Sequence, residues 1–228
     1  MNASDMKTAA VLGAGTMGHG IAQVLAMTGL ETRLFDVAPE AVERGLQAVA
    51  KNLEAGVSRG KVEASVRDSA ITKLSGHTDL EGALAGADVV IEAVPERIAL
   101  KQDLFRRMGE QLGPKALYAS NTSSLSLTEI AKASPHPERV VGMHFFNPVH
   151  IMKLVEVVRA DQSDPSAVQA ALDLARRMGK EPIDVRDAPA SVSVITRDEI
   201  ERQPVQSLGE LLGRLPGVTG GVSPTGAM

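Results

Sequence analysis

Short apolar runs alternate with longer amphipathic segments along most of the chain. The runs are rich in Val, Leu, Ile and Ala, as in residues 87–94, and such runs are typical of strands buried on both faces. The amphipathic segments repeat apolar residues at helical spacing, and residues 17–27 place Ile21, Val24 and Leu25 on one helix face. Strands that alternate with helices predict an α/β fold, with a doubly wound, mostly parallel sheet covered by helices on both faces.

The predicted elements follow one another without an internal repeat. Strands are expected at residues 8–12, 31–35, 87–94, 116–120, 140–146, 154–158 and 181–185. Helices are expected at residues 17–27, 39–53, 62–74, 100–112, 126–133 and 165–178. The segment Ser126-Leu127-Thr128-Glu129 fits a capping box, in which the serine and glutamate side chains bind free amides at a helix start.

A glycine-rich turn, Gly13-Ala14-Gly15-Thr16-Met17-Gly18, joins the first predicted strand to the first helix. In a G-x-G-x-x-G pattern the first glycine permits the turn and the second lets a pyrophosphate approach the backbone. The third lets helix and strand pack closely. Free amides and the dipole at the helix start also favour a bound phosphate. An ordinary tight turn can carry the same glycines, so the motif alone leaves both interpretations open.

Asp36 ends the second predicted strand, eighteen residues beyond Gly18. A carboxylate there can accept hydrogen bonds from the ribose hydroxyls of adenosine, which favours a Rossmann-type dinucleotide site. Without the glycines, Asp36 would be interpreted as a solvated strand-end or helix-cap acid. The carboxylate would repel the extra phosphate of NADP, and no arginine immediately follows it, so the sequence predicts NAD as the cofactor.

Two ionisable residues, His144 and Glu156, lie twelve positions apart in otherwise apolar, strand-like segments. An unpaired buried carboxylate is costly, so Glu156 is expected to have a partner, and His144 is the candidate. A histidine suits removal of a hydroxyl proton while hydride leaves the same carbon, and Glu156 would orient the ring and stabilise the imidazolium. The alternative is a hydrogen-bonded core histidine without a catalytic role.

Composition narrows the class of protein. The chain has 228 residues, 43% hydrophobic and 23% charged, as in soluble globular proteins. A net charge of -4, four Phe, one Tyr and no Trp disfavour a nucleic-acid partner. No cysteine is present and the histidines lack metal-site spacing, so no metal is expected. The first seven residues lack a secretory pattern, and glycines interrupt residues 8–30, so a cytoplasmic protein without membrane insertion is expected.

Over residues 7–187 the chain resembles the nucleotide-binding domain of a 3-hydroxyacyl-CoA dehydrogenase, of the 3-hydroxybutyryl-CoA kind. Four motifs carry the resemblance in order and spacing. They are the glycine loop, Glu92-Ala93-Val94-Pro95-Glu96, Ser120-Asn121-Thr122-Ser123-Ser124, and His144-Phe145-Phe146-Asn147-Pro148 followed by Glu156. The resemblance implies NAD-dependent interconversion of a 3-hydroxyacyl-CoA and a 3-oxoacyl-CoA.

The resemblance also implies roles for single residues. His144 is the implied catalytic base with Glu156 as its partner, and Ser123 and Asn147 contact the reacting part of the substrate or the histidine. Cofactor contacts are implied for Gly13, Gly15, Thr16, Met17, Gly18, Asp36, Glu96, Lys101 and Asn121. Lys61 is implied to lie in a helical arm that covers coenzyme A, with a solvated lysine as the alternative. Residues 121–124 could equally be turn residues ahead of the capped helix.

The resemblance ends near Asp187. The family continues there into a Pro-Gly-Phe turn, an asparagine near the active site, and a helical second domain that supplies dimer contacts and one wall of the acyl cleft. In this chain Ala190 and Ser191 occupy the glycine and phenylalanine positions, and Val194 falls where the family has its asparagine. The family's dimer contacts are therefore expected to be absent, and low activity or none is expected because positioning depends on the missing wall.

Residues 188–222 resemble the beginning of the plug domain of TonB-dependent receptors. Residues 191–195 alternate like a strand, and two capping-box candidates follow. The sequence thus predicts a Rossmann domain over residues 1–187 and a plug-like C-terminal extension over residues 188–228, a chimera of two unrelated segments. The remaining alternatives are a catalytically silent protein that binds NAD or coenzyme A esters, and an interaction module whose extension docks onto an envelope protein.

Overall fold

The computed structural model describes residues 2–186, which belong to one compact unit, Met1–Ala188. Its strands are β1 (Thr8–Leu12), β2 (Glu31–Phe35), β3 (Leu74–His77), β4 (Val89–Glu92), β5 (Leu117–Ser120), β6 (Val140–Phe145), β7 (Leu154–Arg159) and β8 (Glu181–Arg186). Its α-helices are α1 (Thr16–Met27), α2 (Pro39–Ser58), α3 (Ala64–Lys73), α4 (Leu80–Leu84), α5 (Ile98–Leu112), α6 (Leu127–Ala131) and α7 (Pro165–Arg177). Short 3₁₀ helices form at Ala3–Asp5, Gly113–Lys115 and Pro137–Arg139.

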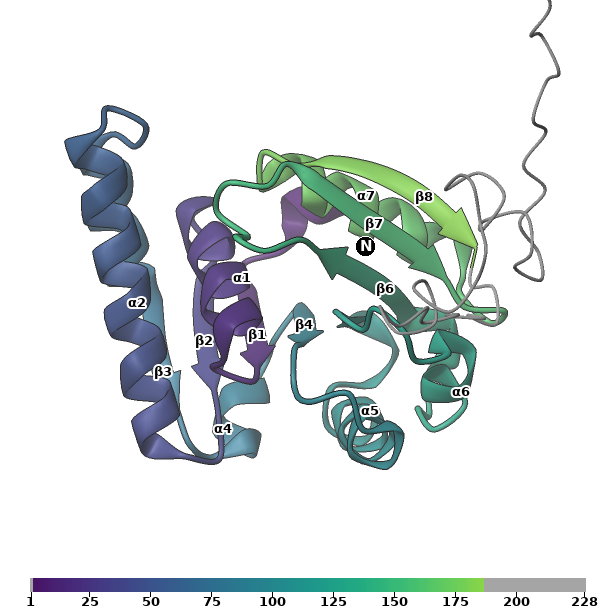
Figure 1. Ribbon diagram of the computed structural model, residues 1–228. Helices are drawn as coiled ribbons and strands as arrows, with labels where there is room; N and C mark the ends of the chain where they lie inside the picture. Colours follow the sequence, from purple (N-terminus) through teal and green to yellow (C-terminus); the bar gives the residue numbers. More distant parts are fainter. Residues whose placement is uncertain (1, 187–228) are drawn as a thin grey trace, which may run out of the picture. The chain divides into compact units, whose positions relative to one another are not determined.

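The described strands form one sheet in the order β3-β2-β1-β4-β5-β6-β7-β8 (Figure 1). Neighbouring strands are parallel except β6 and β7, which are antiparallel. The chain passes from β1 to β2 and β3 on one side, and then returns to place β4 on the other side of β1. Ligands of open α/β sheets bind at the carboxyl ends of the strands beside such a reversal.

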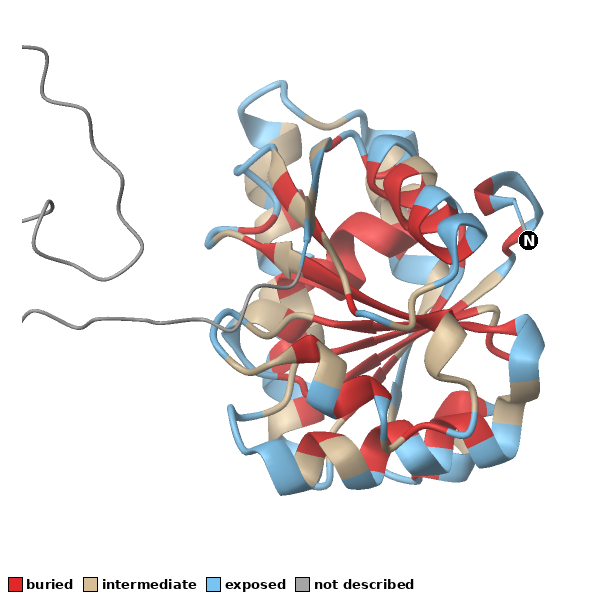
Figure 2. Cartoon of the chain, turned by 90° about the vertical axis from the view of Figure 1, so that its right-hand side faces the viewer, coloured by how far each residue is buried: buried red, intermediate tan, exposed pale blue. Residues whose placement is uncertain are grey.

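Helices cover both faces of this sheet, as Figure 1 shows. Helices α1 and α7 pack on one face, where Ile91 joins their apolar cluster. Helices α4, α5 and α6 pack on the other face, where Val90 joins a second cluster. Adjacent strand residues therefore enter different cores, as the alternation of side chains along a strand requires. Figure 2 shows the buried strands running between helices whose outer surfaces are exposed.

The predicted fold class is confirmed, and each strand and helix expected within residues 2–186 is present. The helix expected at residues 39–53 continues to Ser58. The one expected at residues 62–74 ends at Lys73, where β3 begins.

Strand β3 and helix α4 were not predicted. Strand β3 reads Leu-Ser-Gly-His, without an apolar run, because it is the edge of the sheet and is only partly buried. A Cβ atom on Gly76 would lie 2.4 Å from Cγ1 of Val42, so the glycine lets α2 pack closely over this edge. Helix α4 has five residues, too few for a periodic pattern, and the Asp79 carboxylate caps it by accepting a hydrogen bond from the Gly82 amide.

The C-terminal predictions, including the strand at residues 191–195, the two capping boxes and Val194, lie outside the described residues. The proposed division at residues 187–188 therefore stays a prediction. Within residues 2–186, no helix has both the length and the apolar character needed to cross a membrane.

Candidate functional site

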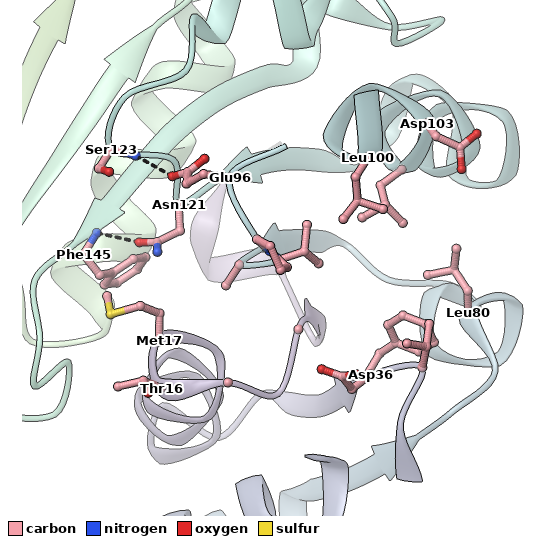
Figure 3. Close-up of a pocket in the computed structure, with 18 of the residues that line it drawn as sticks. Thr16, Met17, Asp36, Leu80, Glu96, Leu100, Asp103, Asn121, Ser123 and Phe145 are labelled. Atoms are coloured by element: carbon pink, nitrogen blue, oxygen red, sulfur yellow. Dashed lines mark hydrogen bonds between the residues drawn. The ribbon is translucent and has the colours of Figure 1, made fainter. Parts of the chain in front are cut away.

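A cavity of about 820 Å³ opens at the carboxyl ends of the parallel strands (Figure 3). Its lining includes the residues that directly follow four strands, namely Gly13, Asp36, Ala93 and Asn121. His144 and Phe145, at the end of β6, also line the cavity. The volume falls within the range of about 300–1,000 Å³ that is usual for cofactor and ligand pockets.

The three glycines of the motif have three different physical roles. Gly13 has a φ of 100°, a conformation that favours glycine, and a Cβ there would meet the carbonyl of Ala93 at 2.6 Å. Gly15 precedes the first residue of α1 and has nothing within 4 Å of a Cβ position, so its open side faces the cavity. A Cβ on Gly18 would lie 1.6 Å from the carbonyl oxygen of Gly13, so only glycine lets α1 approach the loop.

The Asp36 carboxylate joins the end of β2 to the glycine loop. Its Oδ2 accepts a hydrogen bond from the Ala14 amide at 2.9 Å, and its Oδ1 accepts one from the Ala38 amide at 3.1 Å. Asp36 also lines the cavity, and each carboxylate oxygen has a further lone pair for a ligand hydroxyl. The two backbone hydrogen bonds therefore fix the Asp36 side chain at the cavity, and its oxygens can still accept hydrogen bonds from a ligand.

The end of the cavity beside Asp36 is apolar. Figure 3 shows Asp36, Leu80 and Leu100 around this end, opposite Asn121 and Ser123. Val37, Leu80, Leu100 and Leu104 supply its apolar surface. None of the four was predicted as a site residue. The signals available were the position of Val37 next to Asp36 and the one-turn spacing of Leu100 and Leu104 on α5.

His144 and Glu156 face each other across the antiparallel pair β6 and β7. The distance between His144 Nδ1 and Glu156 Oε2 is 2.8 Å, which confirms the predicted pairing. Because an ionised carboxylate only accepts hydrogen bonds, Nδ1 carries the hydrogen and Nε2 of the neutral ring keeps its lone pair. The His144 side chain is 21% exposed and that of Glu156 34%, so the pair is partly open to a ligand.

Residues 121–123 are held by side-chain bonds and are more than a simple turn. Asn121 Oδ1 accepts a hydrogen bond from the Phe145 amide at 2.9 Å, which ties the loop to β6. Glu96 accepts hydrogen bonds from the Ser123 amide at 3.0 Å and the Thr122 hydroxyl at 2.9 Å. Figure 3 shows the Phe145–Asn121 and Ser123–Glu96 bonds. The loop and Glu96 thus form one wall of the cavity.

A buried ion pair lies behind this wall. Glu92 at the end of β4 is fully buried, and its Oε1 lies 2.6 Å from Nζ of Lys101 on α5. Burial raises the pKa of Glu92, while the ammonium of Lys101 acts in the opposite direction. Sequence reasoning placed Glu92 in a motif but gave it no role. The available signal was an acid at the end of an otherwise apolar strand.

The structure places the predicted site residues in two groups. Those that line the cavity are Gly13, Gly15, Thr16, Met17, Asp36, Glu96, Asn121, Ser123 and His144. Glu156 is not part of the lining but forms a hydrogen bond with His144, and Gly18 is buried beneath the glycine loop. Lys61 is exposed on the turn between α2 and α3, and Asn147 is exposed between β6 and β7. Neither these two nor Lys101 is part of the lining.

Comparison with known proteins gives two family matches. Residues 8–188 match the model of the 3-hydroxyacyl-CoA dehydrogenase, NAD binding domain, and residues 184–228 match that of the TonB-dependent receptor plug domain. Both resemblances expected from the sequence are thereby confirmed. A probable 3-hydroxybutyryl-CoA dehydrogenase of Bacillus subtilis is 43% identical over 189 residues, which cover 83% of this chain and 66% of that protein.

Solved structures give the same picture. The crystal structure of 3-hydroxybutyryl-CoA dehydrogenase from Escherichia coli K12 matches with a TM-score of 0.78 at 40% identity, over 81% of this chain and 39% of that chain. That of (S)-3-hydroxybutyryl-CoA dehydrogenase from Ralstonia eutropha matches with a TM-score of 0.78 at 36% identity, over 83% of this chain and 66% of that chain. The present chain thus spans less than the full length of each of these relatives.

Proposed function

Because the chain belongs to the 3-hydroxyacyl-CoA dehydrogenase family through its NAD-binding domain, we propose that the cavity binds NAD. We propose further that the site is built for the interconversion of a 3-hydroxyacyl-CoA and a 3-oxoacyl-CoA. The single observation that carries this proposal is the convergence of the glycine loop, Asp36 and the His144–Glu156 pair on one cavity.

The residues present fit a dinucleotide. The apolar end beside Asp36 suits an aromatic base, and the Asp36 carboxylate suits ribose hydroxyls. The open side of Gly15 at the start of α1 suits a pyrophosphate. Asn121, Ser123 and Glu96 would hold the other end, near His144. When bound, NAD supplies the group that accepts or donates hydride.

His144 and Glu156 handle the proton of the reacting hydroxyl. His144 Nε2 accepts this proton, and Glu156 keeps the hydrogen on Nδ1 and stabilises the imidazolium that forms. Such general base catalysis contributes about 10²–10⁴-fold to a rate. Ser123 and Asn147 are proposed to contact the reacting part of the substrate, and Lys61 to contact coenzyme A from its exposed turn.

The His144 and Glu156 side chains are 21% and 34% exposed, so residues 2–186 do not enclose the pair completely. Hydride transfer depends strongly on positioning of the reactants, and we therefore expect NAD binding with slow turnover or none. A silent protein that binds NAD or coenzyme A esters is the alternative, and a cytoplasmic location stays a prediction from the sequence.

The test combines an NADH titration by calorimetry with an assay of acetoacetyl-CoA reduction by NADH. The wild-type chain and His144→Ala are both expected to bind NADH, and His144→Ala is expected to abolish any measurable turnover. His136→Ala is the matched control, because His136 pairs with Glu138 outside the cavity. Reduction at a rate usual for this family would show that the partial exposure of His144 and Glu156 does not slow turnover. Turnover that persists in His144→Ala would contradict the role of the histidine.

A second function is favoured by the plug-domain match at residues 184–228. We propose that the chain is a chimera whose C-terminal extension is an interaction module for an envelope protein. Deletion of residues 188–228 should then remove a partner captured by the full chain, and an unchanged set of partners would count against the proposal. The coding DNA around Asp187, extended past Met228, would show whether a helical second domain follows in another reading frame.

A further inference from the structure

Lys180 is a buried lysine at the junction of α7 and β8. The residue is 8% exposed, and within residues 2–186 it forms no ion pair with a carboxylate. Burial lowers the pKa of Lys180, and the charge of Lys153 acts in the same direction. An ammonium in such a place needs other hydrogen-bond partners, because burial without them is costly.

Two main-chain carbonyls supply these partners. Nζ of Lys180 donates one hydrogen bond to the Val149 carbonyl and a second to the Met152 carbonyl, the latter at 2.8 Å. Both carbonyls belong to the connection between β6 and β7. Within this connection the amides of Ile151 and Met152 both donate to the Pro148 carbonyl at 2.9 Å, which forms a turn. The ammonium of Lys180 therefore closes this turn from the side of β8.

The backbone fixes the position of Lys180. Gly179 has a φ of 71°, and the amides of Gly179 and Lys180 donate to carbonyls in the last turn of α7, each at 2.9 Å. These bonds form the Schellman pattern that ends many helices. The next amide, that of Glu181, donates to the Lys153 carbonyl at 2.8 Å. Main-chain hydrogen bonds on both sides thus direct the Lys180 side chain toward the turn.

The other side of the turn packs against α1 (Figure 1). A Cβ atom on Gly20 would lie 2.9 Å from Cβ of Val149, so the glycine lets the helix approach the turn closely. Val149 is 2% exposed, whereas Ile151 and Met152 are 61% and 40% exposed. Apolar packing therefore holds only one side of the turn, and the hydrogen bonds of Lys180 hold the rest.

This turn directly follows the proposed catalytic histidine in the chain. The ring of Phe146 contacts that of His144, with 4.7 Å between the ring centroids and 51° between the planes. Asn147, which is proposed to contact the reacting part of the substrate, comes next and is exposed. Only Pro148 separates Asn147 from Val149, so a shift of the turn would move both Asn147 and Phe146.

We propose that Lys180 is a positioning residue that holds the turn of residues 148–152 in place for the site beside it. By fixing the turn, Lys180 sets the position of the Phe146 ring against His144. It sets the position of Asn147 in the same way, and reactions of this kind depend strongly on such placement. The consequence for catalysis rests on the proposed function, whereas the placement of the turn and of Phe146 does not.

The first experiment measures the order of the turn. Lys180→Met removes the ammonium and keeps an unbranched side chain, so the two carbonyls lose their donor. We expect amide hydrogen exchange at Ile151 and Met152 to become about tenfold faster or more, the size of one hydrogen bond to a charged group. Lys153→Met is the matched control. It removes a neighbouring charge, but the exposed Lys153 ammonium forms no hydrogen bond within residues 2–186, so exchange should not change.

The second experiment measures the effect of the turn on the catalytic histidine. Proton NMR signals of the His144 ring report the position of Phe146, because an aromatic ring shifts the resonances of nearby protons. His144→Ala assigns these signals. We expect them to move in Lys180→Met, while the ring signals of His136, which pairs with Glu138 outside the cavity, stay unchanged.

Turnover and cofactor binding should separate in the same variant. Any acetoacetyl-CoA reduction by the wild-type chain should fall by about tenfold or more in Lys180→Met, because misplacement by about 1 Å can cost about 10²-fold. NADH affinity should not change, because Lys180 does not line the cavity.

Two outcomes would overturn the proposal. One is wild-type exchange at Ile151 and Met152 in Lys180→Met, and the other is wild-type His144 signals in that variant. Exchange in β1 and β4 checks that the variant is folded. If it were not, the wild-type chain would decide: slow exchange at the two amides supports the ordered turn, and exchange at the rate of an unstructured chain overturns it.

Failure of the proposed function would be recognised separately. If the wild-type chain bound no NADH, the NAD site would be refuted. The exchange and NMR measurements need no ligand and would still decide the role of Lys180.

Discussion

Two substitutions in the glycine loop separate folding from cofactor binding. A Cβ atom on Gly18 would lie 1.6 Å from the Gly13 carbonyl oxygen and 2.8 Å from its carbon, where ordinary contacts are 3.4–4 Å. The clash is with backbone, which cannot rotate away as a side chain can. A Cβ atom on Gly15 would meet nothing within 4 Å and would project into open space. Gly18→Ala should therefore disturb the packing of α1, and Gly15→Ala should occupy the space proposed for a pyrophosphate.

The magnitudes follow from competing effects. Alanine favours a helix over glycine by about 0.5–1 kcal/mol, while overpacking costs about 1–3 kcal/mol and occasionally more. For Gly18→Ala the clash dominates, and we expect a loss of about 3 kcal/mol, which lowers the melting temperature by about 6–12 °C for a domain of this size. At Gly15, the residue before α1, alanine is a poorer cap than glycine and costs about 0.5–1 kcal/mol.

The assay is urea denaturation followed by far-ultraviolet circular dichroism, paired with titration of NADH fluorescence. Gly15→Ala should keep nearly the wild-type midpoint and lose about tenfold or more in NADH affinity, about 1.4 kcal/mol of binding free energy. Gly18→Ala should instead lower the urea concentration at which half of the protein is unfolded. A wild-type midpoint in Gly18→Ala would refute the packing argument, and undiminished NADH affinity in Gly15→Ala would refute the placement of the pyrophosphate.

The remaining predictions concern the core and acid stability. Phe105 of α5 is fully buried, so Phe105→Ala should cost about 3–5 kcal/mol in urea denaturation, whereas Val37→Ala at an 82% exposed position should stay within about 0.5 kcal/mol. The hydrogen bonds from Arg159 lower the pKa of Asp184 below 3.8, so the ionised form stabilises the fold above that pH and this contribution is lost as pH falls through the lowered pKa. Asp184→Asn should therefore be less stable than the wild type at about pH 7, with a difference that shrinks as the pH falls below 3.8 and through the lowered pKa. A difference that does not change with pH would contradict this account.

The apolar runs predicted most of the sheet because central strands are buried on both faces. Strand β3 was missed because an edge strand needs no apolar run, and α4 because five residues show no period. The missed α4 also hid Leu80, which lines the apolar end of the cavity. Side-chain period and run length therefore predict the interior of this fold better than its edges.

The pairing of His144 with Glu156 was predictable for a different reason. His144 and Glu156 each lie in an apolar strand, so each needed a partner, and the register of β6 and β7 supplies it. Lys101 offered no such signal, because a lysine on an amphipathic helix is usually solvated. Only the packing of α5 against the end of β4 buries it beside Glu92. Contacts of this kind depend on tertiary geometry, which a local pattern does not contain.

The most direct test of the NAD site is a calorimetric titration of the 228-residue chain with NADH and, separately, with NADPH. The Asp36 carboxylate would repel the additional phosphate of NADPH, so the account predicts saturable binding of one NADH per chain, at least about tenfold tighter than NADPH. Absence of NADH binding, or binding of NADPH with equal affinity, would contradict the account.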